Sequence, residues 1–436
     1  MKKWLNLGLK KGLTDLQIFS TKNESLRIDV YNQKVDKHVQ SSVEVMTIRG
    51  IYDGKMSSVR FENLSDANIE SMLDRLIENA KALTTSEPAI IYEGSPSYPE
   101  VVEEETDFEK VDVKDRIQLL MDLEKAVLAS EKIKQVQATQ YQETATETTI
   151  VNTKGLSLSR SNRFAYSYAL GVFGDDNDIV TAYDIKLAKQ FKEFDAKEIA
   201  AKTIDKGVSK LGGKTIKTNR YPVVFSNEMF ASILGVFVPV FTGEAAHKNL
   251  TALKDKVGEK IALDNINIID DPLLPEAFFK SPFDDEGVAC QKRYIVENGV
   301  FKGFFHNLKT AKIFNVEPTG HGFNGAIAPT NCYLEPGKIS FDELIKPIED
   351  GVYITDLVGL HAGVKTVSGD FSLQASGFKI KDGKLDHPVK MIVVSGNFFT
   401  LLNNIKGIAN DFRIDLSNMG SASVYIDEMM IAGEEQ

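Results

Sequence analysis

The sequence predicts an α+β protein, in which an N-terminal mixed strand and helix unit precedes a C-terminal domain with a curved, largely antiparallel sheet packed on a buried helix. Two observations lead to this class. Strands and amphipathic helices alternate irregularly over the first half, and short strands separated by turns follow one strongly apolar helix in the second half. At 436 residues the chain is long for a single core. We therefore expect three regions, residues 1–107, 108–218 and 219–436, of which the first two can pack as one unit.

The first region, residues 1–107, begins as a strand meander. Apolar and polar residues alternate from Asp15 to Phe61, which predicts three or four antiparallel strands. Turns are expected near residues 22–24, 32–34 and 53–54, where polar residues and glycine interrupt the alternation.

A helix and a linker complete this region. Ser65 and Asp66 signal the start of the helix. Its apolar face at helical spacing is formed by Ile69, Leu73, Leu76, Ile77 and Ala80. Residues 84–107 contain three prolines and the acidic cluster Glu103–Glu105, which is the composition of a linker.

The second region, residues 108–218, is expected to have strands between two helices. The first helix covers residues 113–129, and threonine-rich strands follow over 135–151 and 156–173, joined by a turn within 149–155. A second helix covers 196–211, with Gly212 and Gly213 as its C-terminal cap.

The third region, residues 219–436, opens with a short apolar strand, 221–226, that leads into the apolar helix. Five large residues make that helix apolar around much of its girth: Phe230, Leu234, Phe237, Val238 and Phe241. Pro239 is expected to kink the helix just before Gly243. Hairpins are predicted at Asn298–Gly299 and Asp382–Gly383, within a strongly curved sheet.

Composition limits the classes of function. The net charge of −11 disfavours binding to a nucleic-acid backbone. No apolar run reaches the roughly 18 residues of a membrane helix, and lysines interrupt the apolar N-terminal stretch where a signal peptide would need continuity. Cys290 and Cys332 are too few for a disulfide framework and suit a reducing compartment. We expect a cytoplasmic protein that binds neither nucleic acid nor membrane.

Three runs in the third region resemble a known family. They are DDPLLPEAFFKSPFDDEGVACQKRYIVENGVFKGFFHNLKTAKIF, then PTGHGFNG, then SGDFSLQASGFKIKDGKLDHPVKMIVVSGNF. In this order they resemble the C-terminal domain of the TldD/PmbA family, the peptidase-like proteins once called modulators of DNA gyrase. The resemblance covers nearly the whole chain and is most specific over residues 221–433. It implies two branches that act together, a zinc-bearing TldD subunit and a TldE (PmbA) subunit.

The stretch FTGEAAHKN, residues 241–249, decides between the branches. The resemblance implies a helix with the motif H-E-x-x-x-H, in which two histidines hold zinc and the glutamate takes a proton from the metal-bound water. Here Gly243 stands at the first histidine position, Glu244 is kept, and Lys248 stands at the second. His247 is one residue early, about 100° around the helix from that position. The late cysteine of the zinc branch also has no counterpart in DLSNMGSASVYIDEM.

The resemblance therefore implies the TldE/PmbA branch, with no catalytic residue of its own, Glu244 at a degenerate motif position, no metal site and no cofactor. Zinc is expected only in a TldD-like partner. The candidates for a peptide-binding cleft are Gly243, Glu244, His247, Lys248, Ser368, Gly369 and Asp370.

Simpler roles compete for these residues. Glu244 can pair with Lys248 at i, i+4, and His247 can be a structural histidine. Ser368 has no base placed by any motif to activate it. The acidic run Asp284–Glu286 is explained as well by turn hydrogen bonds as by a divalent cation.

Two functions remain open. In the first, the chain is the non-catalytic TldE/PmbA-type subunit of a TldD/TldE-like zinc metallopeptidase that degrades or matures peptides. In the second, it is a stand-alone, homo-oligomeric peptide-binding or regulatory protein of the gyrase-modulator type. The expected partners are a TldD-like zinc-bearing subunit and an unfolded peptide, with a homodimer possible for the isolated chain.

Overall fold

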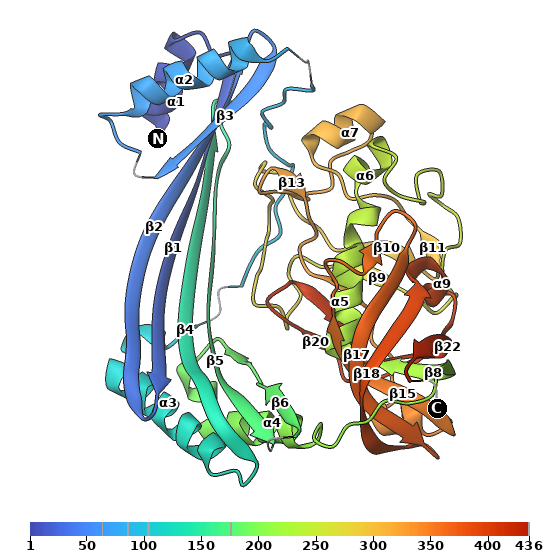
Figure 1. Cartoon of the computed structure of the whole chain (residues 1–436). Coiled ribbons are helices and arrows are strands. Elements are labelled where there is room, and N and C mark those ends of the chain that lie inside the picture. Colours follow the sequence, from blue (N-terminus) through green and yellow to red (C-terminus); the bar gives the residue numbers. More distant parts are fainter. Residues whose placement is uncertain (63, 85–86, 103–104, 175–176, 435–436) are drawn as a thin grey trace. The chain divides into compact units, whose positions relative to one another are not determined.

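The α+β class is confirmed by the computed structural model, which describes residues 1–62, 64–84, 87–102, 105–174 and 177–434 (Figure 1). Two of the acidic linker residues, Glu103 and Glu104, lie outside the described residues. The chain divides into two compact units. Unit 1 comprises Met1–Leu211 together with Asp285–Val288, and unit 2 comprises Gly212–Asp284 together with Ala289–Gln436.

Unit 1 is built on one seven-stranded antiparallel sheet with the order β3-β2-β1-β4-β5-β6, in which β7 also pairs with β5 (Figure 1). Its strands are β1 (Asp15–Tyr31), β2 (Lys34–Tyr52), β3 (Lys55–Glu62), β4 (Ile133–Asn152), β5 (Ser157–Gly174), β6 (Ile179–Ala182) and β7 (Lys186–Ala188). Four of these strands are 17 to 20 residues long, so the sheet is much longer than it is wide.

Helices cover the two ends of this long sheet (Figure 1). At one end lie α1 (Lys2–Lys10) and α2 (Ile69–Ala82), and at the other lie α3 (Val113–Leu128) and α4 (Ala196–Val208), with the 3-10 turns η1 (Phe108–Lys110) and η2 (Phe191–Glu193). The whole predicted apolar face of α2 is buried. Because each helix pair has its own apolar core, the middle of the sheet lies between two separate cores.

Three details of unit 1 differ from the sequence prediction. The turn near residues 22–24 is wrong, because β1 continues unbroken to Tyr31 and Lys22 pairs across the sheet with Glu44. Helix α4, which was predicted to cover residues 196–211, ends at Val208. Helix α1 was not predicted, although Leu5 and Gly8 form a buried face at helical spacing.

Unit 2 contains a second seven-stranded sheet that closes on itself. Its order is β15-β8-β22-β18-β17-β16, and an additional β15–β17 pairing closes the ring. Its strands are β8 (Asn219–Phe225), β15 (Asp350–Val358), β16 (Val364–Lys365), β17 (Asp370–Lys381), β18 (Lys384–Asn397), β19 (Ile405–Ile408) and β22 (Val424–Ala432). The predicted hairpin at Asp382–Gly383 joins β17 to β18. The pairings are antiparallel except for β15 with β8.

A smaller mixed sheet has the order β11-β10-β9-β14-β21-β20, and β12 pairs with β13. These strands are β9 (Ile268–Asp270), β10 (Arg293–Glu297), β11 (Val300–Phe301), β12 (Gly322–Phe323), β13 (Ala326–Ile327), β14 (Cys332–Leu334), β20 (Arg413–Ile414) and β21 (Met419–Ser421). Hairpin Asn298–Gly299 joins β10 to β11, as predicted.

The apolar helix is split, which corrects the prediction of one kinked helix. Helix α5 (Asn227–Phe237) is packed in the main core and ends at Phe237, and the 3-10 turn η3 (Val238–Phe241) follows with Pro239 near its start. Thr242 is extended and begins a new helix, α6 (Gly243–His247). Because proline lacks an N–H and clashes with the preceding turn, α5 cannot continue through it.

The remaining helices of unit 2 are α7 (Leu308–Phe314), α8 (Phe341–Ile345) and α9 (Phe398–Leu402). Of the helices in the described ranges, none combines the length and the apolar character that crossing a membrane requires.

Candidate functional site

The motif residues lie on α6, whose start is fixed to the segment before α7. Thr242 and Phe305 form a parallel bridge, and the Gly243 N–H donates to the Phe305 carbonyl at 2.8 Å. The Thr242 hydroxyl accepts the Ala245 N–H at 3.2 Å and caps the helix. Gly243 is therefore held against residues that follow it by about sixty positions in the chain.

Glu244 and Lys248 form an ion pair one turn apart on α6. Their carboxylate and ammonium groups are 2.5 Å apart, and the side chains are 35% and 56% exposed. The hydrogen bond from Lys248 is the main cause of a lowered pKa of the Glu244 carboxyl. Glu244 is therefore an ionised, partly solvated carboxylate in a helix-surface pair.

His247 and His306 both contact the ring of Phe314. The ring centroids are 6.5 Å apart for His247 and 5.5 Å apart for His306. His247 on α6 therefore packs against Phe314, the last residue of α7.

His306 occupies the space beside Gly243. A Cβ atom on Gly243 would lie 2.5 Å from Cε1 of His306 and 3.1 Å from Oγ1 of Thr310, well inside normal contact distances. The His306 ring is also bordered by Phe304 and Phe314. Position 243, where the resemblance predicts the first histidine of the H-E-x-x-x-H motif, therefore has no room for a side chain while His306 is in place.

Hydrogen bonds define the tautomer of His306. Its Nδ1 lies 3.1 Å from the Thr310 hydroxyl, and that hydroxyl donates to Oδ1 of Asn307 at 3.0 Å. Because the hydroxyl proton is used on Asn307, we assign the ring proton to Nδ1 of His306. Nε2 is then an acceptor, and no hydrogen bond to it is formed within the described ranges.

Burial keeps the His306 ring neutral. Its residue is 6% exposed, and burial lowers the pKa of His306 to about 4, with further lowering by the positive charge of Arg293 and by His321. The site therefore presents a neutral imidazole with an oriented acceptor nitrogen beside the N-terminus of α6.

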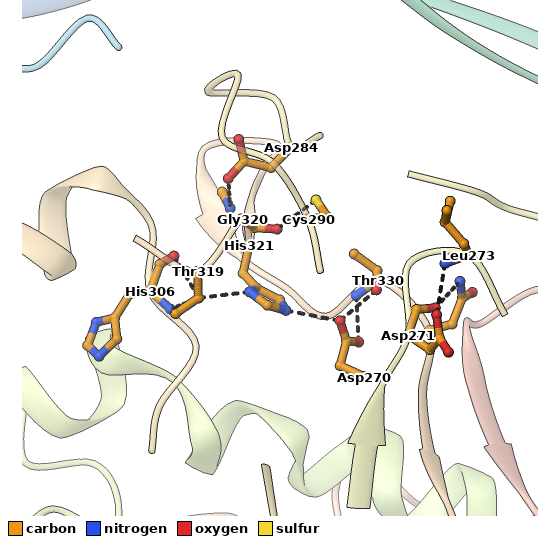
Figure 2. Close-up of polar contacts among 12 residues, drawn as sticks. Asp270, Asp271, Leu273, Asp284, Cys290, His306, Thr319, Gly320, His321 and Thr330 are labelled. Atoms are coloured by element: carbon orange, nitrogen blue, oxygen red, sulfur yellow. Dashed lines mark hydrogen bonds and ion pairs between the residues drawn. The ribbon is translucent and has the colours of Figure 1, made fainter. Parts of the chain in front are cut away.

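A buried polar network supports this histidine (Figure 2). Asp270 accepts a hydrogen bond from Nε2 of His321 at 3.0 Å, and Nδ1 of His321 lies 2.8 Å from the Thr319 hydroxyl. The Thr319 hydroxyl also contacts the backbone N and O of His306, at 2.7 and 3.0 Å. Asp270 further accepts from the backbone and hydroxyl of Thr330, at 2.8 and 2.6 Å. The network fixes the backbone from which the His306 side chain projects.

The second predicted cluster forms a separate turn. The Ser368 hydroxyl donates to Asp370 at 2.8 Å, and the Asn397 amide donates to Asp370 at 2.9 Å. These hydrogen bonds, with the Asn397 bond first, lower the pKa of the Asp370 carboxyl. Gly369 has φ +86°, as a tight turn requires. In the part of the chain that the structure describes, no hydrogen bond or ion pair joins this turn to Gly243–His247, so the structure brings together only the α6 members of the predicted set.

The three residues of the acidic run Asp284–Glu286 have different partners. Asp284 is fully buried and accepts the Gly322 N–H at 2.8 Å (Figure 2). Within unit 1, Asp285 pairs with Arg160 at 2.7 Å and Glu286 pairs with Arg49 at 3.3 Å. Among the described residues, no group of three His, Cys, Asp or Glu side chains is arranged to hold a metal ion.

His306 and its support were not predicted from the sequence. A local signal exists in HNLKT, where Asn307 caps α7 and Thr310 lies one turn after His306. Its proximity to Gly243 depends on the Thr242–Phe305 bridge, which no local pattern reveals.

Three family models match nearly the whole chain. The PmbA/TldA metallopeptidase C-terminal domain matches residues 218–433, the central domain matches 106–211, and domain 1 matches 16–80. A metalloprotease PmbA homologue of Buchnera aphidicola is 26% identical over 440 residues, covering 98% of this chain and 95% of that protein.

Solved structures give the same result. A Thermotoga maritima protein named as a candidate modulator of DNA gyrase superposes with a TM-score of 0.91 and 31% identity, covering 99% of both chains. TldE from Thermococcus kodakarensis shares the fold with a TM-score of 0.88 and 24% identity, covering 99% of this chain and 100% of that chain.

Proposed function

Because this chain belongs to the PmbA/TldD metallopeptidase family, we propose that it is a TldE/PmbA-type subunit that contributes peptide-contacting surface to a zinc-bearing, TldD-like partner and has no zinc site of its own. The observation that carries this proposal is the position of His306, whose ring takes the space of a side chain at Gly243. A subunit that held zinc on α6 would need that space for a ligand.

The donors on α6 do not fit a zinc ion. Gly243 offers no side chain, and the ammonium of Lys248 is a cation bound to Glu244. His306 supplies only one imidazole beside position 243, whereas zinc needs at least three protein ligands. Glu244 is engaged with Lys248 and has a lowered pKa, which makes it a poor proton acceptor at neutral pH.

The same arrangement suits contact with an unfolded peptide. An extended peptide presents backbone N–H groups that must find acceptors when they leave water. The partly exposed Glu244 carboxylate on α6 offers such an acceptor, and the buried His306 ring packs behind the start of this helix. We therefore place the accessible side chains of α6, Glu244, His247 and Lys248, in the surface that contacts the peptide, in a complex that degrades or matures peptides. Two free, buried cysteines suit a cytoplasmic location.

The test is a reconstituted pair with a TldD-like partner, assayed on an unfolded peptide. We expect cleavage to be lost when the partner's zinc ligands are removed and to change less than threefold with Glu244→Gln in this chain. Lys248→Gln is the matched control, because it breaks the same ion pair without touching the carboxylate. A loss of about 100-fold or more with Glu244→Gln alone is the signature of a general base and would refute the proposal.

The peptide contact has its own readout. His247→Ala is expected to raise KM for the peptide more than it lowers kcat, because it removes an exposed side chain from the ground-state contact surface of α6. Binding is measured separately with a fluorescently labelled copy of the unfolded peptide. If the isolated chain binds this peptide as tightly as the pair does, the chain acts without a partner, and the stand-alone peptide-binding function replaces this proposal.

A further inference from the structure

Arg293 is a partly buried cation that has no bonded partner. It lies at the start of β10, and the residues on either side of it, Lys292 and Tyr294, are exposed. Among the described residues, the Arg293 guanidinium forms no hydrogen bond and no ion pair. Arg116, by contrast, pairs with Glu143. Because a guanidinium group keeps its charge and has five N–H donors, Arg293 has donors that lack a protein acceptor.

Asp270, the carboxylate beside Arg293, is already hydrogen-bonded to other groups. The two residues lie directly opposite each other in the β10–β9 pair, so their side chains are on one face of the sheet. The oxygens of Asp270 accept hydrogen bonds from the backbone and hydroxyl of Thr330 and from His321 (Figure 2). Burial lowers the pKa of the Arg293 guanidinium, and the negative charge of Asp270 opposes this shift. Asp270 therefore acts on Arg293 through its charge, while the N–H donors of Arg293 stay unused.

Arg293 belongs to the same region of unit 2 as the start of α6. Burial is the main cause of the lowered pKa of His306, and the positive charge of Arg293 is the second cause. The His306 ring in turn lies against Gly243, the first residue of α6. Because the effect of one charge on another falls with distance, this coupling places Arg293 within electrostatic range of the site around α6.

We propose that the Arg293 guanidinium binds a carboxylate of the unfolded peptide. The planar guanidinium group matches a carboxylate with two parallel N–H···O hydrogen bonds, which gives unused donors of this kind a specific ligand. A peptide offers a carboxylate at its C-terminal end and on aspartate or glutamate side chains. This inference rests on the proposed function, because it names the chemical group of the peptide that this chain recognises.

The first test compares unfolded peptides that carry an N-terminal fluorophore and share one uncharged sequence. The first peptide ends in a free carboxylate, the second ends in an amide, and the third ends in an amide but has one internal glutamate. Fluorescence anisotropy gives their affinities for the full-length chain, alone and in the reconstituted pair. We expect at least one carboxylate peptide to bind about tenfold more tightly than the uncharged amide, because hydrogen bonds between charged groups are the stronger ones. The tighter peptide identifies the source of the carboxylate.

Variants of Arg293 should change this preference. Arg293→Gln should abolish it, and Arg293→Lys should keep only part of it, because lysine retains the charge but not the paired donors. Lys292→Gln is the matched control, since it removes the same charge from the adjacent residue, whose side chain is 51% exposed and pairs with Asp271. The control should keep the preference. If Arg293→Gln weakens all three peptides alike and leaves the preference intact, Arg293 only supports the fold and the proposal is wrong.

A second test uses the wild-type chain and so does not depend on the folding of variants. Phenylglyoxal modifies accessible guanidinium groups, and mass spectrometry locates the modified residues. The preferred carboxylate peptide should slow the modification of Arg293, and the uncharged amide should not. Arg220, whose side chain is 61% exposed, is the reference that neither peptide should protect.

The possible failures are distinguishable. The carboxylate site is refuted if the three peptides bind the wild type equally, if Arg293 resists modification without peptide, or if a saturating carboxylate peptide leaves Arg293 unprotected. The proposed peptide contact survives each of these results. If none of the peptides binds the chain or the pair, the peptide contact itself is refuted, and this inference with it.

Discussion

The His306 imidazole lies where a side chain of Gly243 would be, so the two residues exclude each other's side chains. The Thr242–Phe305 bridge fixes their backbones side by side, and the Thr319 hydroxyl holds the backbone of His306. The sequence resemblance predicts a histidine at position 243 in a zinc-bearing relative, and in this chain a histidine from another segment fills that space. A single substitution at Gly243 therefore tests the packing of the whole site.

Gly243→Ala should destabilise the protein by about 1–3 kcal/mol, because the new methyl group overlaps the His306 ring, which is enclosed by Phe304 and Phe314. The cost should shrink by more than half in a His306→Ala background. Urea unfolding of the two single variants and the double variant measures this coupling.

Gly235→Ala is the matched control for this cycle. Gly235 is also helical, but a Cβ there would meet the flexible side chain of Met419, with 3.1 Å to its Cγ. Its effect should stay within about 1 kcal/mol and should not depend on His306. Equal costs at Gly243 in both backgrounds would show that His306 does not fill the space.

The stability of the fold should fall on acidification through the titration of His306. The folded pKa is lowered to about 4, whereas the unfolded side chain titrates near its ordinary 6.5. Between pH 6.5 and about 4, His306 is protonated in the unfolded state but stays neutral in the folded state. The free energy of unfolding therefore falls progressively as the pH is lowered through this range, and His306 contributes no pH dependence above it. The loss is about 2 kcal/mol at pH 5.

His306→Gln should remove this part of the pH dependence. Unfolding free energies of the wild type and the variant at pH 7.5 and pH 5 provide the measurement, and the difference between their pH-induced changes isolates His306. If the wild type loses no more stability than the variant between these pH values, the ring is not held neutral by burial.

The buried carboxylate of Asp270 should be the most sensitive point of the supporting network. Thr330→Val keeps the side-chain shape but removes the 2.6 Å hydrogen bond from the hydroxyl to Asp270, which is fully buried. Losing a hydrogen bond to a buried charge costs about 1.5–3 kcal/mol. Thermal unfolding should show this loss.

Thr251→Val serves as its control, because Thr251 is also buried and, within the described ranges, its hydroxyl accepts a neutral backbone N–H, from Leu253 at 3.1 Å. Thr251→Val should lower the free energy of unfolding less than Thr330→Val does. The reverse order would mean that Asp270 does not rely on Thr330.

Local chemistry explains which parts of the fold the sequence could predict. The hairpins at Asp53–Gly54, Asn298–Gly299 and Asp382–Gly383 were predictable because their first residues adopt positive φ, which asparagine and aspartate tolerate next to glycine. The polar residues at 22–24 gave a false turn. They are polar because β1 is partly or fully exposed there, and polarity without glycine or proline does not bend a strand.

The site depended on contacts that a linear pattern does not contain. The α6 motif and its Glu244–Lys248 pair could be predicted, because i and i+4 residues are neighbours on any helix. The helix break before Gly243 was only half predicted: Pro239 pointed to a kink, but a fresh helix capped by Thr242 needed the tertiary bridge to Phe305. His306 enters the site through the same bridge, as does its network to Asp270.

Restoring the histidines of the motif should not by itself create a zinc site. In Gly243→His with Lys248→His, the imidazole at 243 must displace the ring of His306, which is held by Thr310 and enclosed by aromatic rings. Neither described cysteine is placed as a thiolate ligand: the Cys290 thiol is buried and donates to the Gly320 carbonyl, and burial raises the pKa of the Cys332 thiol in β14 well above the usual value. We expect this double variant to bind zinc no more tightly than the wild type in competition with a chromophoric chelator. Adding His306→Ala should free the space and raise the affinity for zinc at least tenfold, although the affinity should remain far below that of a three-ligand site.

Lys256→His with Lys260→His, placed on the exposed surface before β9, is the control for zinc bound by surface histidines alone. If the double variant binds stoichiometric zinc tightly with His306 in place, the site has room for a ligand at 243, and the packing argument against a metal on α6 fails.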